Sequence, residues 1–207
     1  MGLMSRIFAL TYDRSMARME KAGFAELRAR ALGQAAGDVL EIGGGTGSNL
    51  RFYGPAVTSL TIAEPEAPML KRLEKKVREQ GSPAKVVRAA AEDLPFADDS
   101  FDTVVSTLVL CGVEDQRRSL REIRRVLRPG GRLVFVEHVR SDDPKLARTQ
   151  DRMNGLNRFV ARCDCNRATL DAIRSEGFEI ESLEHTTLNK VPKFVRPAIV
   201  GAATAAS

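Results

Sequence analysis

The chain has no tryptophan, only two tyrosines and two histidines among its 207 residues. Proteins that bind nucleic acid without base-specific contacts use aromatic side chains as stacking platforms, so this shortage argues against such a partner. The formal net charge is +5, but basic residues alternate with acidic ones, as in Glu122-Ile123-Arg124-Arg125. That alternation is typical of solvated helices rather than of a basic binding face. We therefore expect no nucleic-acid partner.

Long apolar runs are also missing. No segment approaches the roughly 20 apolar residues that a membrane-spanning helix needs, and residues 3–10 are too short and too interrupted for a secretory signal. Three cysteines (Cys111, Cys163 and Cys165) are too few for a disulfide framework. From these absences we expect a cytoplasmic protein with free thiols and no stable membrane insertion.

A glycine-rich loop is the most informative feature that the chain does contain. The strand-like run Val39-Leu40-Glu41-Ile42 leads directly into Gly43-Gly44-Gly45-Thr46-Gly47. Glycine allows a backbone to turn sharply and lets a ligand approach without a Cβ in the way. The Glu41 carboxylate at the mouth of this turn suits a ligand with an ammonium or sulfonium group and not a phosphate. The loop therefore favours S-adenosylmethionine over a nucleoside phosphate.

Two other glycine loops must be compared with this one. The dinucleotide fingerprint needs a third glycine where this chain has Ser48, and the glycine-lysine-serine/threonine run of a phosphate-binding loop is missing. Taken alone, a glycine cluster is also compatible with an ordinary structural turn. Motifs elsewhere in the chain are needed to distinguish these alternatives.

Beyond the loop, short β-branched or apolar runs alternate with segments of helical spacing, as a parallel sheet requires. Apolar residues three and four positions apart, such as Leu120, Ile123 and Leu127, predict one buried helix face. The predicted strands cover 58–63, 84–88, 101–107, 132–139 and a last pair from 178, and the predicted helices cover 66–80, 114–128 and 167–175.

We therefore predict an α/β protein with a Rossmann-like, doubly wound, mostly parallel seven-stranded sheet. Residues 1–36 are predicted to form a helical extension and residues 37–207 the main domain. The extension is expected either to close over a ligand as a lid or to pack as a simple helix. The helix over 114–128 is expected to end abruptly at Pro129-Gly130-Gly131, and the alanine-rich residues 202–206 are expected to be frayed.

In an open parallel sheet the ligand lies beyond the carboxyl ends of the strands. Glu64 ends the second strand, where its carboxylate can accept hydrogen bonds from two ribose hydroxyls; the alternative is an ordinary helix-capping acid. Residues after the third strand are placed to face an adenine, and residues after the fourth to lie beside a methionine group. Besides the loop and Glu64, the cofactor-binding candidates are Asn49, Pro65, Met69, Ala91, Glu92, Asp93, Ser106, Thr107 and Leu108.

With these motifs in this order, the chain resembles a class I S-adenosylmethionine-dependent methyltransferase of the small-molecule (type 11) branch. The resemblance runs from Val39 to Val139. It implies a metal-free reaction in which a methyl group moves from S-adenosylmethionine to a small molecule, leaving S-adenosylhomocysteine. Apart from the loop and Glu64, the motifs that carry it are Ala91-Glu92-Asp93-Leu94-Pro95-Phe96, Ser100-Phe101-Asp102 and Leu127-Arg128-Pro129-Gly130-Gly131.

Within that branch the chain resembles the methyltransferase-like thiol S-methyltransferases. The stretches 106–113 and 136–139 carry this closer resemblance, together with Cys165-Asn166-Arg167 and Val195-Arg196-Pro197. Quinone-biosynthesis C-methyltransferases share the core motifs but match the C-terminal part less well. Two departures stand out: Ala90 occupies a position where the family often has Asp, and the apolar anchor of the animal thiol enzymes is not matched.

The resemblance therefore implies an enzyme that methylates a small molecule, with a thiol acceptor favoured. Alternatives are an O-, N- or C-methyltransferase of a natural product or quinone-type acceptor, or a binding module that holds the cofactor without turnover. A nucleic-acid methyltransferase acting on an exocyclic amine would carry an Asn/Asp-Pro-Pro-Tyr/Phe turn after the fourth strand, where this chain has Ser106-Thr107-Leu108-Val109. The chain is expected to be a monomer or a homodimer.

Two residues are candidates for catalysis. His138, just beyond the fifth strand, is placed to act as a base or to position the acceptor, with a structural hydrogen-bonding role as the alternative. Tyr12, beside Asp13 in the N-terminal extension, is a candidate to face the acceptor, with ordinary surface placement as the alternative. Cys163 and Cys165 lack a second pair of ligands, so we expect them to pack in a loop and expect no metal site.

Overall fold

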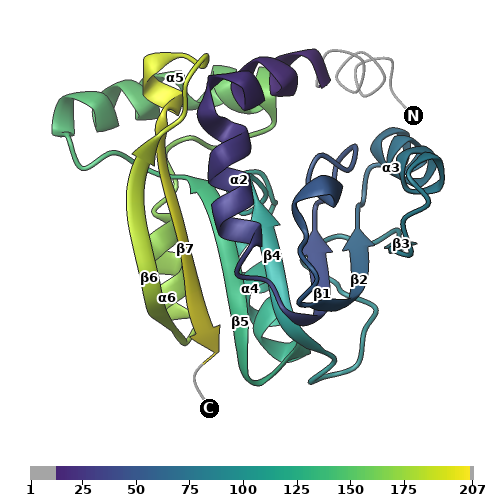
Figure 1. The fold of residues 1–207 in the computed structure, drawn as a ribbon. Helices are drawn as coiled ribbons and strands as arrows, with labels where there is room; N and C mark the ends of the chain where they lie inside the picture. Colours follow the sequence, from purple (N-terminus) through teal and green to yellow (C-terminus); the bar gives the residue numbers. More distant parts are fainter. Residues whose placement is uncertain (1–12, 206–207) are drawn as a thin grey trace.

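The computed structural model describes residues 13–205, and within them a seven-stranded sheet forms the centre of the molecule (Figure 1). The strand order is β3-β2-β1-β4-β5-β7-β6. The first five strands run parallel, and β7 runs antiparallel to both β5 and β6. The predicted Rossmann-like, doubly wound, mostly parallel seven-stranded sheet is thereby confirmed. The strands are β1 Gly37–Ile42, β2 Val57–Ala63, β3 Lys85–Val87, β4 Phe101–Thr107, β5 Leu127–His138, β6 Phe178–Thr187 and β7 Pro197–Ala205.

Helices cover both faces of the sheet. In Figure 1, α2 lies in front of the sheet, α4 and α6 lie behind it, and α5 lies along the upper edge. Within residues 13–205, no helix has the length and apolar character needed to span a membrane. The helices are α2 Ala25–Leu32, α3 Ala67–Glu79, α4 Gln116–Val126, α5 Pro144–Ala161 and α6 Thr169–Ser175, with short turns η1 Glu20–Phe24, η2 Leu50–Phe52 and η3 Lys193–Val195.

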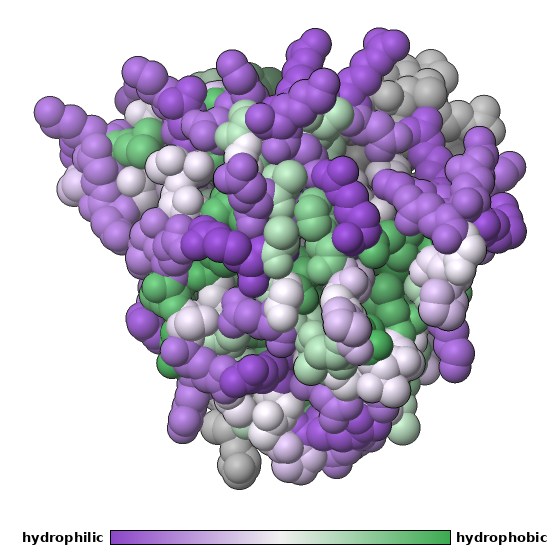
Figure 2. Space-filling view, viewed as in Figure 1, coloured by the Kyte–Doolittle hydropathy of each residue, from purple (hydrophilic) through white to green (hydrophobic). Residues whose placement is uncertain are grey.

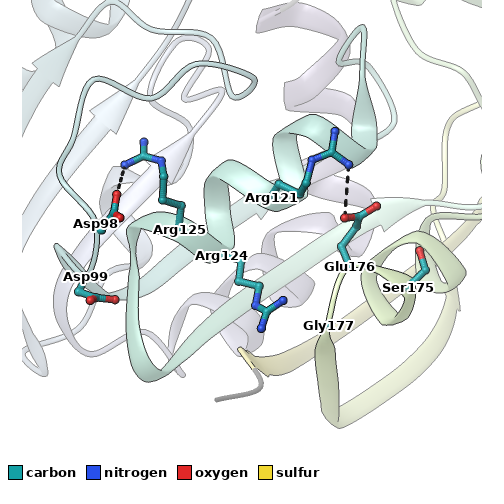
Figure 3. A pocket seen from close by; sticks show the side chains of 8 residues that line it. All are labelled: Asp98, Asp99, Arg121, Arg124, Arg125, Ser175, Glu176 and Gly177. Carbon is teal, nitrogen blue, oxygen red and sulfur yellow. Dashed lines mark hydrogen bonds and ion pairs between the residues drawn. The ribbon is translucent and has the colours of Figure 1, made fainter.

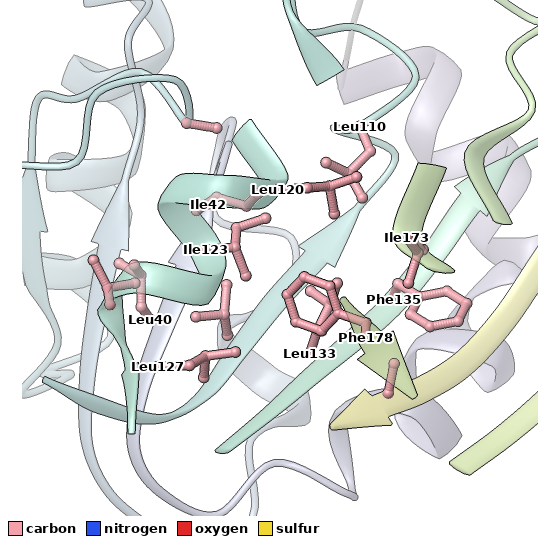
Figure 4. Close-up of a cluster of buried hydrophobic side chains, with 14 of the residues drawn as sticks. Leu40, Ile42, Leu110, Leu120, Ile123, Leu127, Leu133, Phe135, Ile173 and Phe178 are labelled. Carbon is pink, nitrogen blue, oxygen red and sulfur yellow. The ribbon is translucent and has the colours of Figure 1, made fainter. Parts of the chain in front are cut away.

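The central strands are apolar on both sides because helices bury both faces. Successive side chains of a strand point to opposite faces, so neighbours in β5 enter different cores. Leu133 and Phe135 pack behind the sheet with Ile123 of α4, as Figure 4 shows. Val134, between them, packs on the front face with Leu32 of α2. The near-continuous apolar runs in the sequence therefore record a sheet covered on two sides.

The boundary between α4 and β5 differs from the prediction. The helix begins after Asp115, whose side chain accepts a hydrogen bond from the Arg118 backbone N–H at 2.9 Å, and it ends at Val126. Strand β5 already begins at Leu127, which pairs with Phe101. The helix predicted to residue 128 and the strand predicted from 132 were therefore wrong here, because Leu127 completes the apolar stripe as extended backbone.

Helix α5 is a second difference, because no helix was predicted over residues 144–161. It begins at Pro144, and the preceding Asp143 caps it by accepting a hydrogen bond from the Lys145 N–H at 2.9 Å. Its buried face is polar: the Gln150 side-chain amide donates to the carbonyls of Val139 and Cys165 at 3.0 and 2.7 Å. A helix buried through amides carries no apolar stripe for a sequence to reveal.

The alanine-rich end of the chain is also not frayed as predicted over its described part. Residues 202–205 belong to β7, which lies between β5 and β6. Small residues are needed there: a Cβ on Gly201 would lie 2.2 Å from the Ser182 carbonyl oxygen and 2.8 Å from the Phe135 ring. The alanines therefore reflect close packing against β5 and β6.

The N-terminal extension packs onto the front face of the sheet. Residues 13–19 are helical, η1 follows with a kink at Gly23, and α2 completes the segment. Met16, Met19 and Phe24 are buried against the core strands. Strand β1 begins at Gly37, next to the predicted domain boundary. The division into residues 1–36 and 37–207 stays a prediction, as does movement of the extension as a lid.

Candidate active site

A cavity of about 760 Å³ opens where β1, β2 and β4 end. Its size lies in the range of small-molecule sites, and its position is the one that open parallel sheets use for ligands. Figure 2 shows hydrophilic side chains crowding the upper edge, towards which these strands point in Figure 1. The lining residues are Gly43, Gly45, Glu64, Pro65, Glu66, Met69, Ala90, Ala91, Glu92, Leu108, Val109, Gly112, Val113, Glu114, Asp115, Arg118, Arg158, Ala161, Arg162 and Asp164.

The glycine loop forms one wall of this cavity because its neighbours leave no room for side chains. Gly43 and Gly45 both have φ of 57°, which favours glycine. A Cβ on Gly43 would lie 2.6 Å from Val109 Cγ2, and one on Gly44 only 2.2 Å from Ile62 Cγ2. The loop therefore lies directly on side chains from β2 and the segment after β4, and a ligand can approach bare backbone.

Glu64 connects the end of β2 to the glycine loop. Its Oε2 accepts a hydrogen bond from the Gly45 N–H at 2.8 Å, and its Oε1 accepts one from the Glu66 N–H at 2.8 Å. Burial raises the pKa of this carboxyl, while the two backbone hydrogen bonds act in the opposite direction. Glu64 lines the cavity beside Pro65 and Met69, so its oxygens lie where a ligand hydroxyl can reach them.

Glu41 lies beneath the loop and does not line the cavity. It is 2% exposed and accepts hydrogen bonds from the Asn49 side-chain amide at 3.0 Å and the Tyr53 hydroxyl at 2.7 Å. Burial raises its pKa from 4.5 to about 7, although both hydrogen bonds and the charge of Arg28 lower it. Asn49 also donates to Thr107 Oγ1 at 3.2 Å. Glu41 therefore anchors a polar network under the loop.

Arg28 joins the N-terminal extension to that network. It is 3% exposed, pairs with Glu20 at 2.8 Å and donates to the side-chain oxygen of Asn49. Its guanidinium also lies 4.3 Å from the centre of the Phe24 ring. Sequence reasoning missed Arg28, but its spacing of four residues from both Phe24 and Leu32 placed it on the buried helix face.

Glu137 fixes the segment after β4 and was also missed. Its Oε1 accepts hydrogen bonds from the Ser106 hydroxyl at 2.7 Å and from the N–H groups of Val109 and Leu110 at 2.9 and 3.1 Å. Burial raises its pKa, and these hydrogen bonds oppose the rise. The residue they help to position is Leu108, with φ of 57°, an uncommon value for a leucine. The sequence does contain one indication of this role, because Glu137 is a charged residue within the apolar run of β5.

The predicted cofactor-binding residues fall into two groups. One group lines the cavity: Gly43, Gly45, Glu64, Pro65, Met69, Ala91, Glu92 and Leu108. The other group lies outside its lining: Glu41, Gly44, Thr46, Gly47, Asn49, Asp93, Ser106 and Thr107. Thr46, for example, turns away and donates from its hydroxyl to Asp13 at 2.7 Å. Direct contact of each residue with the cofactor stays a prediction.

Several residues that line the cavity were not among the predicted site residues. Val109, Gly112 and Val113 follow β4, and Arg158 and Arg162 come from the end of α5. These last two had no signal, because α5 itself was not predicted. The segment after β4 is held by Arg167, from the motif of the thiol-enzyme resemblance: its guanidinium donates to the carbonyls of Leu110 and Val113 at 2.9 and 2.6 Å.

The two catalytic candidates have different outcomes. Tyr12 lies outside the described residues, so its role stays a prediction. His138 is 7% exposed and does not line the cavity. Its Nδ1 lies 3.3 Å from Cys163 Sγ and 3.6 Å from Cys111 Sγ. Cys165, which the sequence grouped with Cys163, has its sulfur 3.7 Å from Asn154 Oδ1 instead.

A second hollow, of about 580 Å³, lies near the start of β4, and Figure 3 shows the side chains that line it. It is lined by residues before β4 and from the ends of α4 and α6. Ion pairs cross it: Arg125 with Asp98 at 2.8 Å and Arg121 with Glu176 at 3.5 Å. Because β4 begins beside this hollow, it is not at the ligand-binding edge of the parallel strands.

The sheet order, the glycine loop after β1 and the acid at the end of β2 define a class I S-adenosylmethionine-dependent methyltransferase. A family profile described as "Methyltransferase domain" matches residues 40–135. The chain is also 33% identical over 199 residues to the human thiol S-methyltransferase TMT1A, covering 94% of this chain and 81% of that protein. The chain therefore belongs to the S-adenosylmethionine-dependent methyltransferases and is an enzyme of that class.

Two further proteins show how far the similarity extends. Human thiol S-methyltransferase TMT1B is 42% identical over 132 residues, which cover 61% of this chain and 53% of that protein, so the match spans about half of the relative's length. A solved S-adenosylmethionine-dependent methyltransferase from Thermotoga maritima, described as a possible histamine N-methyltransferase, has a TM-score of 0.71 at 25% identity. Its match covers 99% of this chain and 100% of that one.

The described residues fit the cofactor of this family. The cavity has the size of a small-molecule site, and the glycine loop in its wall has no room for a Cβ at Gly43. Glu64 offers charged oxygens at the end of β2, and Met69 and Leu108 offer apolar surface. When bound, S-adenosylmethionine supplies a methyl group already activated by a sulfonium. The chain's own task is then to orient both reactants and to exclude water.

Proposed function

We propose that this methyltransferase acts on small-molecule thiols. The observation that carries the proposal is the similarity to a thiol S-methyltransferase over 94% of the chain. That match extends well beyond the residues 40–135 of the general methyltransferase profile. It therefore includes most of the N-terminal extension and of the segments after β5, and the latter contribute Arg158, Arg162 and Asp164 to the cavity.

The side chains around the cavity support an acceptor that ionises by itself. Among the described residues that line it there is no histidine, lysine, tyrosine or cysteine. A thiol has a pKa of about 8.5, so about a tenth of it is thiolate near pH 7.5. A phenol with a pKa of about 10 ionises far less and depends more on a base. Among these acceptors, a thiol therefore depends least on a catalytic base in the cavity.

Within residues 13–205, six carboxyl groups and three guanidinium groups line the cavity, and two of the guanidinium groups lie together at the end of α5. Arg162 pairs with Glu66 at 3.1 Å, and Arg158 lies 3.5 Å from Asp164, so two guanidinium groups stay at the end of α5. A nearby cation favours the ionised form of an acid and lowers its pKa. Val109 and Val113 add apolar surface to the same wall, which helps to exclude water from the acceptor.

The test compares acceptor atoms on one carbon skeleton. Benzyl mercaptan, benzyl alcohol and benzylamine are offered separately with S-adenosylmethionine that carries a deuterated methyl group, and products are measured by mass spectrometry. If the enzyme acts on thiols, benzyl mercaptan should give labelled thioether. Benzyl alcohol and benzylamine should be methylated at least about 100-fold more slowly. A demethylquinone in the same series tests carbon methylation. Faster transfer to oxygen, nitrogen or carbon than to sulfur would overturn the proposal.

Two variants separate cofactor binding from acceptor chemistry. Glu64→Gln is expected to weaken cofactor binding for every acceptor, whereas Glu179→Gln, on an exposed part of β6, should leave all rates unchanged. Tyr12→Phe and His138→Ala then test the two catalytic candidates with the best acceptor.

A cytoplasmic location and a monomeric or homodimeric state stay predictions of the sequence.

A further inference from the structure

Cys111, His138 and Cys163 form a buried cluster beside the candidate active site. They come from three separate places: the segment after β4, the last residue of β5 and the segment after α5. Their exposed fractions are 1%, 7% and 8%. One ligand atom from each residue lies within 4.8 Å of the other two. Two thiols and an imidazole thus converge on a common point in the interior.

As a set of hydrogen bonds, this cluster is poorly satisfied. Both sulfurs approach His138 Nδ1, at 3.3 and 3.6 Å, but one ring nitrogen offers a single lone pair. His138 Nε2 is buried and has no hydrogen-bond partner among the described residues. A thiol is a weak donor, and an unpartnered buried polar atom costs free energy. The lone pair of Nδ1 cannot serve both sulfurs, whereas an ion bound at Nδ1 would hold the ring and both sulfurs at once; Nε2 takes no part in this contact.

The distances match a shared metal ion. Zinc lies about 2.3 Å from a cysteine sulfur and about 2.0–2.1 Å from a histidine nitrogen. At a tetrahedral angle these bond lengths separate sulfur from nitrogen by about 3.6 Å. The observed separations from His138 Nδ1 are 3.3 Å to Cys163 and 3.6 Å to Cys111. Small side-chain movements would therefore bring all three atoms to bonding distance of one ion.

We propose that Cys111, Cys163 and His138 form a binding site for a thiophilic divalent cation of the Zn²⁺ type. Two thiolates and a neutral imidazole are the ligands that such ions prefer. Zn²⁺ takes four ligands, and the described chain supplies three, which leaves one place for a small molecule such as water. Binding replaces two thiol protons, so each ion taken up releases about two protons.

A carboxylate lies next to this cluster: Glu137 Oε2 accepts a hydrogen bond from the Cys111 N–H at 3.2 Å. A negative group at this place favours a cation. The bound ion in turn favours thiolate over thiol strongly enough to displace the thiol protons. This cation site does not depend on which acceptor the enzyme methylates.

The site lies in the wall of the active-site cavity. Gly112 directly follows Cys111, and Arg162 and Asp164 flank Cys163; all three of these neighbours line the cavity. A Cβ on Gly112 would lie 2.8 Å from the Arg162 carbonyl oxygen, so the two cysteine-bearing segments are in close contact. An ion bound to both cysteines would clamp the segment after β4 to the segment after α5.

The experiment is a metal titration of chelator-treated protein in the presence of a non-thiol reductant. Zn²⁺ is added in competition with a chromophoric indicator, and Co²⁺ is added as a spectroscopic probe. We expect one equivalent of Zn²⁺ to bind, and Co²⁺ to show thiolate-to-metal charge-transfer absorption. Cys163→Ser should weaken Zn²⁺ binding by about 100-fold or more, since it removes a ligand. Cys165→Ser is the matched control and should bind Zn²⁺ as the parent protein does.

Folding is checked separately so that a misfolded variant does not decide the result. S-adenosylmethionine binding by calorimetry, measured without metal, shows that Cys163→Ser is folded. Zn²⁺ should raise the melting temperature of the parent protein and of Cys165→Ser, but not that of Cys163→Ser. Equal Zn²⁺ affinity in the parent protein and Cys163→Ser, or bound Co²⁺ without sulfur charge transfer, would overturn the assignment.

Discussion

The Glu64 carboxylate accepts a hydrogen bond at 2.8 Å from the backbone N–H of Gly45, which joins the end of β2 to the glycine loop. A second backbone hydrogen bond, from Glu66, holds the same carboxylate at the start of α3. One side chain thus sets the spacing of the two strand ends between which the cavity opens. The position of Glu64 matters for the cofactor both directly, as an acceptor, and through the loop.

Glu64→Gln tests these contributions together. Glutamine keeps one side-chain oxygen, which can accept from the Gly45 N–H or from the Glu66 N–H but not from both. It also loses the negative charge that strengthens hydrogen bonds to ligand hydroxyls. We expect S-adenosylmethionine affinity to fall by about 10- to 100-fold, the equivalent of a charge-assisted hydrogen bond, measured by calorimetry. Unchanged thermal stability together with unchanged affinity would show that Glu64 does not contact the cofactor.

Arg28 is expected to be important for stability. Replacing it with alanine removes the 2.8 Å partner of Glu20 Oε1, although Glu20 Oε2 still pairs with Arg51 at 2.5 Å. It also removes a hydrogen bond to Asn49 beneath the loop. Breaking a buried ion pair costs about 3–5 kcal/mol when the remaining charge has no other partner, so with Arg51 in place Arg28→Ala should lower the free energy of unfolding by about 2–3 kcal/mol. Urea denaturation at constant pH measures the change.

The matched control lies on the same helix. Arg30 is exposed and pairs with Glu184 at 2.8 Å, so Arg30→Ala should cost less than about 1 kcal/mol. Arg28→Lys should not restore the parent stability, because lysine lacks the planar fork that reaches both partners. Similar costs for Arg28→Ala and Arg30→Ala would contradict the assignment of Arg28 to a buried network.

Gly44 tests whether the loop is held as closely as its geometry indicates. A Cβ there would lie 2.2 Å from Ile62 Cγ2, and Ile62 is fully buried. Gly44→Ala should therefore destabilise the fold by about 1–3 kcal/mol and weaken cofactor binding. At Gly54 a Cβ meets nothing within 4 Å, so Gly54→Ala should stay within about 0.5 kcal/mol of the parent protein. Equal effects at both positions would contradict the close packing.

A glycine within α5 should respond in the opposite direction. Gly155 is exposed, and a Cβ there would meet nothing within 4 Å. Because alanine restricts the unfolded chain and favours helix, Gly155→Ala is expected to stabilise the protein by about 0.5–1 kcal/mol. Thermal unfolding followed by circular dichroism measures this shift. A loss of stability would mean that α5 does not continue through residue 155.

The strands of the sheet and the glycine loop were predictable because local pattern determines them. Val39, Val104 and Val134 belong to near-continuous apolar runs, which are typical of strands that helices bury on both faces. Helix α5 was not predictable, because Gln150 and Asn157 bury it through amide hydrogen bonds, which leave no hydrophobic period. Sequence pattern reports apolar burial far better than polar burial.

The cysteine–histidine cluster shows a second limit. Cys163 and Cys165 are adjacent enough to suggest a pair, yet the partners of Cys163 are Cys111 and His138. These residues meet only because β4 and β5 are neighbours in the sheet and α5 returns the chain to their carboxyl ends. Glu41 is a similar case: it was expected just after the first strand, but it lies within β1, and its surroundings beneath the loop include Arg28 and Tyr53 from other segments.

The buried Glu41 should give the protein a distinctive dependence of stability on pH. Burial raises its pKa from 4.5 to about 7, so between these values the unfolded chain has released the proton while the folded chain retains it. Native stability therefore falls as the pH rises through this window. At about 1.4 kcal/mol per pH unit, the contribution of this group amounts to about 3 kcal/mol by pH 7 and above.

Glu41→Gln removes that contribution, because glutamine does not titrate. The free energy of unfolding, from urea denaturation at pH 5.0 and pH 7.5, should decrease more steeply with pH for the parent protein than for Glu41→Gln. All other titrating groups are shared, so the difference between the two slopes belongs to Glu41. Glu179→Gln, which changes an exposed carboxyl in β6, should follow the parent protein. Parallel curves for the parent protein and Glu41→Gln would show that Glu41 is ionised at both pH values and that its burial is compensated by Arg28 and Tyr53.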